Sequence, residues 1–403
     1  MVELSTYQRE SVNQLHNGCI LMGGVGSGKS RTALSYYYTK VCGGSLDNDN
    51  FKICNYVDLY IITTARKRDT LEWESELVPF PLEGINVTVD SWNNIEKYKD
   101  VENSFFIFDE QRVAGYGKWS KTFIHISKKN KWILLTATPG DKWEDYIPVF
   151  IANGFYKNKT EFMHEHAIYN RYVTKFPKVD GYTGTKKLER YRDGITVYMH
   201  YKSKANAHTD YILAEYDRAK YKRVMKERWD IYEDAPIENI SKLCYLLRRI
   251  ANEDKSRAEI VKQIVESKKK VIIFYNFDFE LEILKQIAVD ISVPIAEWNG
   301  HTHEPTPSSD TWMYAVQYSA GAEGWNCIET DTIIFYSLNY SYKTTVQAAG
   351  RIDRRNTPFQ DLYYFYIYSH SSMDLAIRRC LNEKKTFNET KFMNTNSRKK
   401  HGL

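Results

Sequence analysis

The sequence lacks the features that mark several common classes of protein. No stretch approaches eighteen consecutive apolar residues, so a membrane-spanning helix is not expected. The first residues, Met-Val-Glu-Leu-Ser-Thr, have neither the basic start nor the apolar core of a secretory signal. The six cysteines are scattered and form no Cys-x-x-Cys pair. They are therefore interpreted as reduced thiols of a cytoplasmic protein, and a structural metal is not expected.

Charge of one sign is also scarce. A formal net charge of +5 over 403 residues does not by itself indicate a polyanionic partner. Residues 384–403, however, hold six lysines and arginines and a single acid, Glu389. This basic tail could bind nucleic-acid phosphates, or it could be a solvated terminus, and both interpretations remain open.

Apolar runs alternate with helical segments in two parts of the chain. The first series, up to about Gly154, contains expected strands at 19–22, 57–63, 86–89, 105–108 and 132–135. The second contains expected helices around 240–250 and 258–265, then strands at 271–275, 312–317, 332–336 and 363–368. Unbroken β-branched and aromatic runs alternating with helices predict parallel sheets covered on both faces.

The expected fold class is therefore α/β, with two parallel-sheet domains at 1–154 and 236–383. Between them, residues 155–235 form a mixed, charged and aromatic middle region, and 384–403 are the basic tail. One amphipathic helix is expected in the middle region, with Tyr221, Met225, Trp229 and Tyr232 on one face.

Residues 23–30, Gly-Gly-Val-Gly-Ser-Gly-Lys-Ser, have the pattern of a phosphate-binding loop between a strand and a helix. Gly23, Gly26 and Gly28 would let the backbone N–H groups approach phosphates. Lys29 would neutralise the β- and γ-phosphates, and Ser30 would bind Mg²⁺. The phosphates would lie at the N-terminus of the following helix, where the helix dipole favours anions.

Two further strand ends carry polar residues. Asp109 and Glu110 follow the apolar run Phe105–Phe108. Asp109 could hold Mg²⁺ opposite Ser30, while Glu110 could polarise the attacking water as general base. Thr136 and Thr138 end another apolar run, and their hydroxyls could hydrogen-bond the acidic pair or the other domain.

Far along the chain, the segment Gln347-Ala-Ala-Gly-Arg351-Ile-Asp-Arg354 places two arginines three residues apart. At this spacing they could reach the terminal phosphate of the nucleotide. Together with the phosphate loop, they predict an active site completed by residues of both α/β domains.

These motifs occur in the order found in superfamily 2 helicases and resemble most the Swi/Snf-type branch, in a compact bacterial or bacteriophage form. The resemblance extends over about residues 4–370 and includes Tyr7-Gln8, Lys270–Phe277 and Ala322–Asn326 besides the motifs above. It implies two RecA-like domains, ATP and Mg²⁺ as cofactors, and cytoplasmic localisation in a bacterium or phage-infected cell.

The resemblance also implies roles for individual residues. Gln8 matches the glutamine that reads adenine, and Gln347 lies in the final motif, in which Arg351 or Arg354 acts as an arginine finger. Thr136 and Thr138 match the motif that couples hydrolysis to movement. The residues that match nucleic-acid contacts are Thr64, Arg66, Ser91 and Gly324. One departure is Arg112, which stands where the family commonly has Asp or His as the coupling residue.

The leading hypothesis is an ATP-driven DNA helicase or duplex translocase of replication, repair or recombination. An RNA-remodelling helicase is the alternative within the same class. A non-motor phosphoryl-transfer enzyme and a nucleotide-gated interaction protein are alternatives of other classes. The first would need neither the arginine motif nor a second α/β domain, and intact Lys29, Asp109 and Glu110 argue against the second.

Overall fold

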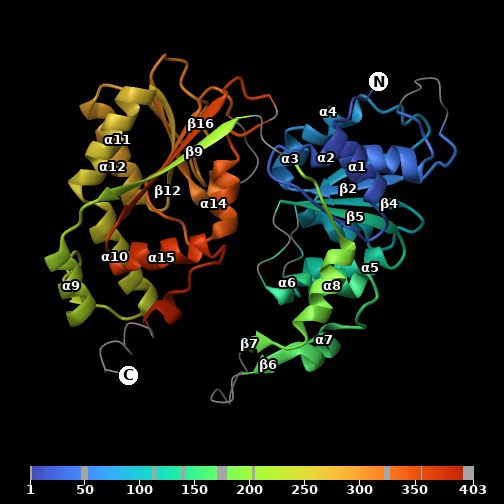
Figure 1. Ribbon diagram of the computed structural model, residues 1–403, viewed down its shortest axis with the longest axis horizontal. Helices are drawn as coiled ribbons and strands as arrows, with labels where there is room; N and C mark the ends of the chain where they lie inside the picture. Colours follow the sequence, from blue (N-terminus) through green and yellow to red (C-terminus); the bar gives the residue numbers. More distant parts are fainter. Residues whose placement is uncertain are drawn as a thin grey trace. The chain divides into compact units, whose positions relative to one another are not determined.

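The computed structural model describes residues 2–46, 53–110, 113, 116–137, 140, 142–169, 179–201, 205–321, 327–354 and 356–393. The chain divides into two compact units, Met1–Lys202 and Ser203–Leu403 (Figure 1). Each unit is built around a six-stranded sheet in which every pair of neighbouring strands is parallel. The predicted α/β class with two parallel sheets is confirmed.

In the first unit the strand order is β3-β2-β4-β5-β1-β8. The bounds are β1 Ile20–Met22, β2 Leu59–Thr63, β3 Val87–Ser91, β4 Phe105–Asp109, β5 Lys131–Thr136 and β8 Thr196–Tyr198. The helices are α1 Thr6–Gln14, α2 Lys29–Tyr36, α3 Ala65–Asp69, α4 Glu72–Leu77, α5 Lys118–Ser127, α6 Trp143–Ala152, α7 Lys159–His166 and α8 Thr185–Ile195. A π-helical turn, Tyr37–Val41, extends α2, a 3₁₀ segment spans Trp92–Tyr98, and β6 Ala167–Tyr169 pairs with β7 Val179–Tyr182.

The apolar strands explain why this sheet is covered on both faces. Along β4, Phe105 and Ile107 belong to one hydrophobic core, whereas Phe106 and Phe108 belong to the other. Side chains alternate across a strand, so a run of consecutive apolar residues needs a cover on each side. Helices α1, α2 and α4 supply core residues on the first face, and α5, α6 and α8 on the second.

In the second unit the strand order is β13-β14-β12-β15-β16-β9. The strands are β9 Asn206–Ala214, β12 Lys270–Tyr275, β13 Ile295–Trp298, β14 Trp312–Gln317, β15 Thr332–Phe335 and β16 Asp361–Ser369. The helices are α9 Arg218–Glu227, α10 Ile240–Asn252, α11 Lys255–Lys268, α12 Asp278–Asp290, α13 Tyr318–Gly321, α14 Tyr342–Ala349 and α15 Ser372–Asn382, and β10 Trp229–Asp230 pairs with β11 Ala235–Pro236. Helices α11 and α12 cover one face of the sheet and α14 lies on the other (Figure 1).

The region 155–235 does not form a unit of its own. Its strand β8 pairs with β1 in the first sheet, and β9 pairs with β16 in the second, so the division falls between Lys202 and Ser203. Backbone pairing at the two sheet edges thus joins parts of this segment to both units, and the expected domain boundaries at 154 and 236 stay a prediction.

The expected helix carrying Tyr221, Met225, Trp229 and Tyr232 is shorter than its hydrophobic pattern suggested. Helix α9 ends at Glu227, and Arg228 adopts a left-handed conformation with φ of 57°. Trp229 therefore starts the short strand β10, and Tyr232 lies in the turn that follows. A left-handed residue of this kind terminates many helices.

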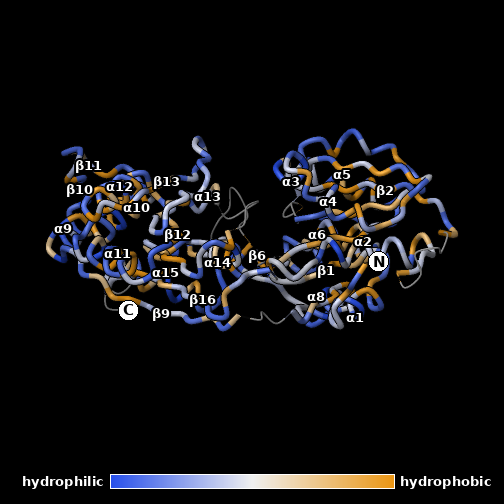
Figure 2. Tube along the Cα trace, turned by 90° about the horizontal axis from the view of Figure 1, so that it is seen from above, coloured by the Kyte–Doolittle hydropathy of each residue, from blue (hydrophilic) through white to orange (hydrophobic). Residues whose placement is uncertain are grey.

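Hydrophobic and hydrophilic segments alternate along the chain in both units (Figure 2). In the described part of the chain, no helix combines the length and the apolarity that crossing a bilayer requires.

Candidate active site

The phosphate-loop sequence has the backbone conformation that its glycines permit. Gly26 and Gly28 have φ of 77° and 78°, in the left-handed region, and Gly28 is the N-cap of α2. A side chain at Gly23 would place its Cβ 2.5 Å from Ser27 Oγ. The Gly23 N–H also donates to the carbonyl of Thr136, 3.1 Å away, which ties the loop to the end of β5. The loop thus leads from β1 to the N-terminus of α2, where the dipole favours an anion.

Lys29, the first residue of α2, turns its ammonium group back to the loop. Its Nζ donates to the carbonyls of Gly23 and Gly24, each at 2.8 Å. Ser30 follows it in the first turn of the helix. The positive charge and the N-terminus of α2 therefore belong to the same loop, as binding of a triphosphate requires.

Gln8 contacts this loop from α1. The side chain is fully buried, and its Nε2 donates to the carbonyl of Gly28 at 3.3 Å. Its Oε1 accepts from the backbone N–H and the hydroxyl of Ser5. Tyr7 Oη donates to the carbonyl of Ser27 at 3.1 Å. The predicted adenine-reading segment is thus in direct contact with the predicted phosphate loop.

Asp109, the last residue of β4, lies in a set of hydrogen-bond donors. Its Oδ2 accepts from Thr63 Oγ1 at 2.9 Å, Lys67 Nζ at 2.9 Å and Trp73 Nε1 at 3.1 Å. The side chain is almost completely buried. A buried carboxylate is tolerated where charged and polar donors satisfy it, and these three donors do so.

Glu110 follows in a strained conformation. Its φ of 58° is in the left-handed region, which a residue with a side chain adopts at a cost. Its Oε1 accepts from Lys67 Nζ at 3.2 Å, so a single ammonium group joins both acidic residues. Burial alone would lower the pKa of Lys67, but the charges of Asp109 and Glu110 outweigh burial and raise it. Strain held in place by neighbours is common at functional sites.

The sequence interpretation missed this support. Lys67 and Trp73 come from α3 and α4, Thr63 ends β2, and Trp92 Nε1 donates to the backbone carbonyl of Asp109 at 2.8 Å. The signal was present in part, because a tryptophan in a buried environment needs an acceptor for its N–H. The sequence did not show which acceptor that would be.

Sheet order brings the predicted strand ends together. Strand β5 lies between β1, which leads into the phosphate loop, and β4, which ends at Asp109. Thr136 is the last residue of β5 and is buried. All strands of the sheet are parallel, so these ends lie at the same edge, where ligands of α/β proteins bind. Thr138, the other expected coupling residue, lies outside the described residues.

The donor set fits Mg²⁺, the metal that the motifs imply. Asp109 and Ser30 offer oxygen atoms, and the three side-chain donors described above all contact Oδ2 rather than Oδ1 of Asp109. Among the described residues, no group of three or more His, Cys, Asp or Glu side chains forms a metal cage. Mg²⁺ often binds through one or two protein oxygens, substrate phosphates and water, so this sparse set is consistent with it.

The residues expected to contact nucleic acid lie in different environments. Thr64 Oγ1 caps α3 by accepting from the N–H of Lys67, and Arg66 lies in α3. Ser91 is buried at the end of β3, where its hydroxyl accepts from Arg68 Nη1 at 3.3 Å. Ser91 thus contacts the chain itself in this structure. Gly324 lies outside the described residues, as does Arg112.

The arginine motif lies in the second unit. Gln347 is buried in α14, which ends at Ala349, and Arg351 and Arg354 follow the helix. Ile352, between the two arginines, is fully buried, so the core of this unit anchors the segment. The backbone carbonyl of Arg351 accepts from the N–H of Cys327 at 3.2 Å.

Comparison with protein-family models and with curated protein sequences finds no match. Solved structures similar to the chain include the Sulfolobus solfataricus SWI2/SNF2 ATPase core in complex with double-stranded DNA. It has 16% sequence identity and a TM-score of 0.42, over 97% of this chain and 92% of that one. The Sulfolobus solfataricus SWI2/SNF2 ATPase core domain is also similar, with 15% identity and a TM-score of 0.40, over 95% of this chain and 89% of that one.

Proposed function

We propose that the protein is a nucleic-acid-stimulated ATPase that uses ATP hydrolysis to move on or remodel DNA, in replication, repair or recombination. The observation that carries the proposal is the contact set at one sheet edge. There, the phosphate loop with Lys29 and the Asp109–Glu110 pair follow strands separated only by β5. DNA is favoured over RNA because the motifs resemble the Swi/Snf-type branch.

Different residues of the first unit carry out phosphate binding, metal binding and activation of the attacking water. The N–H groups at the start of α2 and the Lys29 ammonium bind the phosphates. Asp109 and Ser30 would hold Mg²⁺, which when bound neutralises charge on the phosphate oxygens. Glu110 accepts a proton from the attacking water as general base. Lys67, which contacts both carboxylates, orients the acidic pair.

Arg351 and Arg354 of the second unit supply positive charge to the γ-phosphate in the transition state, so turnover depends on both units. Replacing each arginine by alanine should leave ATP affinity within a few-fold, while one replacement lowers stimulated turnover by about a hundredfold or more. Near-normal turnover in both variants would contradict a role for the second unit in hydrolysis.

Two substitutions separate binding from hydrolysis in the first unit. Lys29→Ala should abolish turnover because the loop loses its point charge. Glu110→Gln should lose hydrolysis but keep the affinity for Mg²⁺-ATP, since Asp109 still binds the metal. Fluorescent ATP titrations and phosphate release, measured on the same preparations, test this, and an equal loss of ATP binding in both variants would refute the assigned roles.

The polymer is identified by comparing ATPase stimulation by duplex, single-stranded, forked and four-way DNA and by RNA. DNA should stimulate more strongly than RNA, and the affinity for DNA should fall steeply with salt because backbone contacts dominate. Stimulation by RNA alone would establish the RNA-remodelling alternative. If no nucleic acid stimulates the ATPase, the proposed motor function is refuted.

A further inference from the structure

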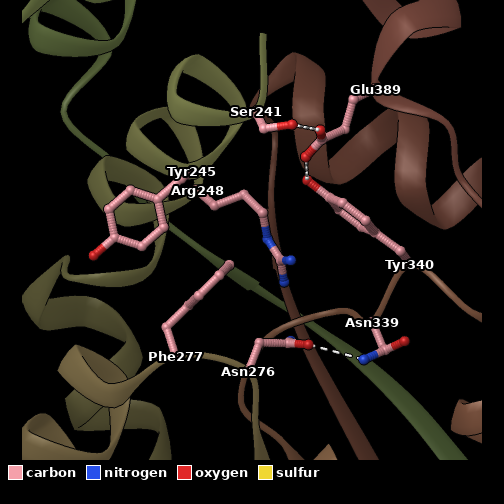
Figure 3. A pocket seen from close by; sticks show the side chains of 8 residues that line it. All are labelled: Ser241, Tyr245, Arg248, Asn276, Phe277, Asn339, Tyr340 and Glu389. Carbon is pink, nitrogen blue, oxygen red and sulfur yellow. Dashed lines mark hydrogen bonds between the residues drawn. The ribbon is translucent and has the colours of Figure 1, made fainter. Parts of the chain in front are cut away.

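The second unit contains a pocket built from residues outside its arginine motif. It has a volume of about 300 Å³ and lies between α10, the turn after β12 and the turn after β15 (Figure 3). The residues after β12 and β15 lie at the carboxyl edge of the parallel sheet, which is the usual place for ligands in this class of fold. The volume is at the lower end of the range of small-molecule sites, about 300–1,000 Å³.

Arg248, which extends from α10 into the group of lining residues, is the unusual feature of the pocket (Figure 3). Its side chain is 3% exposed, and its Nη2 donates to the carbonyl of Leu338 at 2.6 Å. The guanidinium carbon lies 4.6 Å from the ring centre of Phe277 and 4.8 Å from that of Tyr340. Its buried Nε has no hydrogen-bond partner, and within the described part of the chain Arg248 forms no ion pair.

Arg257 in the same unit shows how this fold otherwise buries an arginine. It is fully buried and donates to the carbonyls of Ala251, Tyr336 and Ile367. It also pairs with Asp374 at 2.8 Å. Buried charges are generally paired because desolvation of a lone charge is costly. The pocket therefore places a buried cation that has no ion-pair partner among the described residues next to empty space, which points to an anionic ligand.

Other lining groups suit a planar ring. The rings of Tyr245 and Phe277 pack edge to face, with their centres 5.2 Å apart. Asn276 and Asn339 add amide groups, joined by a hydrogen bond of 2.8 Å (Figure 3). Arginine binds phosphate through its planar fork, and aromatic side chains stack on bases of any sequence. An arginine and two aromatic rings in one pocket match a nucleotide unit.

Glu389, from the C-terminal segment, already places an anion at this pocket. Its Oε2 accepts from Ser241 Oγ at 2.7 Å, and its Oε1 accepts from Tyr340 Oη at 3.0 Å (Figure 3). The buried side chains of Phe387 and Phe392 pack in the core beneath and anchor the segment. A carboxylate held there repels a second anion and uses two hydroxyls that a phosphate could contact.

We propose that this pocket binds the phosphate and base of a nucleotide unit, in competition with Glu389. Arg248 pairs with the phosphate, and the rings of Tyr245 and Phe277 contact the base. The unit is either a free nucleoside monophosphate or a nucleotide within a nucleic-acid strand. The site uses no residue of the phosphate loop or of the arginine motif, so it does not depend on the proposed ATPase activity.

The test is calorimetry on the full chain carrying Lys29→Ala, which weakens phosphate binding at the loop. The probes are deoxyadenosine monophosphate, deoxyadenosine, inorganic phosphate and a short single-stranded oligodeoxyadenylate. Adding Arg248→Met should weaken binding about tenfold or more, because a charge-assisted hydrogen bond is lost. Adding Glu389→Gln should tighten it several-fold. Arg249→Met, on the same helix but over the ring of Tyr232, is the matched control and should change nothing.

Arg248→Met and Glu389→Gln are expected to change the affinity in opposite directions, whereas damage to the fold would weaken binding in both variants. Binding of the monophosphate identifies a free nucleotide, and binding of the oligonucleotide alone identifies a strand. If Arg248→Met fails to fold in thermal unfolding, Tyr245→Leu replaces it and should weaken the monophosphate more than inorganic phosphate. Unchanged affinity in the Arg248 and Tyr245 variants, no binding of either nucleotide probe, or weaker binding with Glu389→Gln would overturn the proposal.

Discussion

Asp90 illustrates at the scale of one residue how the edge of the first sheet is held. Burial opposes its ionisation, but four donors outweigh burial: Tyr98 Oη, Asn94 Nδ2, the N–H of Ser91 and Arg68 Nη1. Together they lower the pKa of Asp90 to about 2. The residue lies in β3, one position before Ser91, so its network also orients the segment expected to contact nucleic acid.

The lowered pKa predicts a pH-dependent contribution to stability. An ordinary aspartate has a pKa of about 3.9, so the contribution is complete above that value and is lost as the pH falls towards 2. Asp90→Asn should therefore lower the free energy of unfolding by on the order of 2 kcal/mol at pH 7, with a gap that closes on acidification. Urea unfolding of both proteins between pH 7 and pH 2.5 measures it.

Asp69→Asn is the matched control for this prediction, because Asp69 contacts the same Arg68 but is exposed. Its replacement should change stability by less than about 1 kcal/mol at any pH. A difference between the wild type and Asp90→Asn that stays constant with pH would show that shape, not charge, explains the effect.

At the scale of the element, the sequence predicts strands well when their residues are apolar on both faces. The expected strand around 105–108 and that at 271–275 agree with β4 and β12 to within one residue at either end. Strand β9 was missed because it is an edge strand with mostly exposed residues, and its apolar run is confined to its second half. Its pairing with β16 depends on distant residues that local patterns do not encode.

The same distinction applies to the candidate site: residues within local motifs could be predicted, whereas their distant hydrogen-bond partners could not. Lys29 and Asp109 belong to local motifs, and their positions follow from a strand followed by a loop. Lys67 and Trp73 contact Asp109 across 42 and 36 positions of sequence. Which donor satisfies a buried carboxylate is decided by packing between elements, and a single sequence does not report that packing.

Trp73 provides a test of how α4 supports β4. Trp73→Phe keeps a buried aromatic ring but removes the N–H that Asp109 accepts, so stability should fall by about 1–3 kcal/mol. Thermal and urea unfolding measure the loss. Trp119→Phe is the control, because Trp119 packs near Trp92 and its ring is only partly buried. Equal losses in the two variants would mean that the ring, and not its hydrogen bond, supports Asp109.

At the scale of the whole molecule, each sheet receives one edge strand from the middle region, residues 155–235: β8 in the first unit and β9 in the second. Strand β8 pairs with β1 through Ile20, Leu21 and Met22, immediately before the phosphate loop. The N–H of Met199 also donates to the carbonyl of Met22 at 2.8 Å. The first unit is therefore incomplete without residues up to about 202.

This organisation predicts how fragments behave. A fragment of residues 1–202 should fold cooperatively and bind ATP, whereas a fragment of residues 1–154 should not, because β1 would keep β5 but lose β8 and become an exposed edge. Circular dichroism during thermal unfolding and titration with fluorescent ATP would compare the two. A stable, ATP-binding 1–154 fragment would show that β8 is dispensable.

The placement of β8 also has a mechanical consequence. The chain leaves the first unit after β8 and enters the second at β9, which pairs with β16 along nine residues. Tension on this connection would act on the two strands at its ends, and the backbone hydrogen bonds of β8 to β1 and of β9 to β16 would resist it. In the first unit the neighbour that shares the load is β1, and Met199 lies close to both Gly23 and Ser27. A pull on β8 would therefore reach the segment proposed to hold the phosphates, and we expect the dwell time of a bound nucleotide to respond to force.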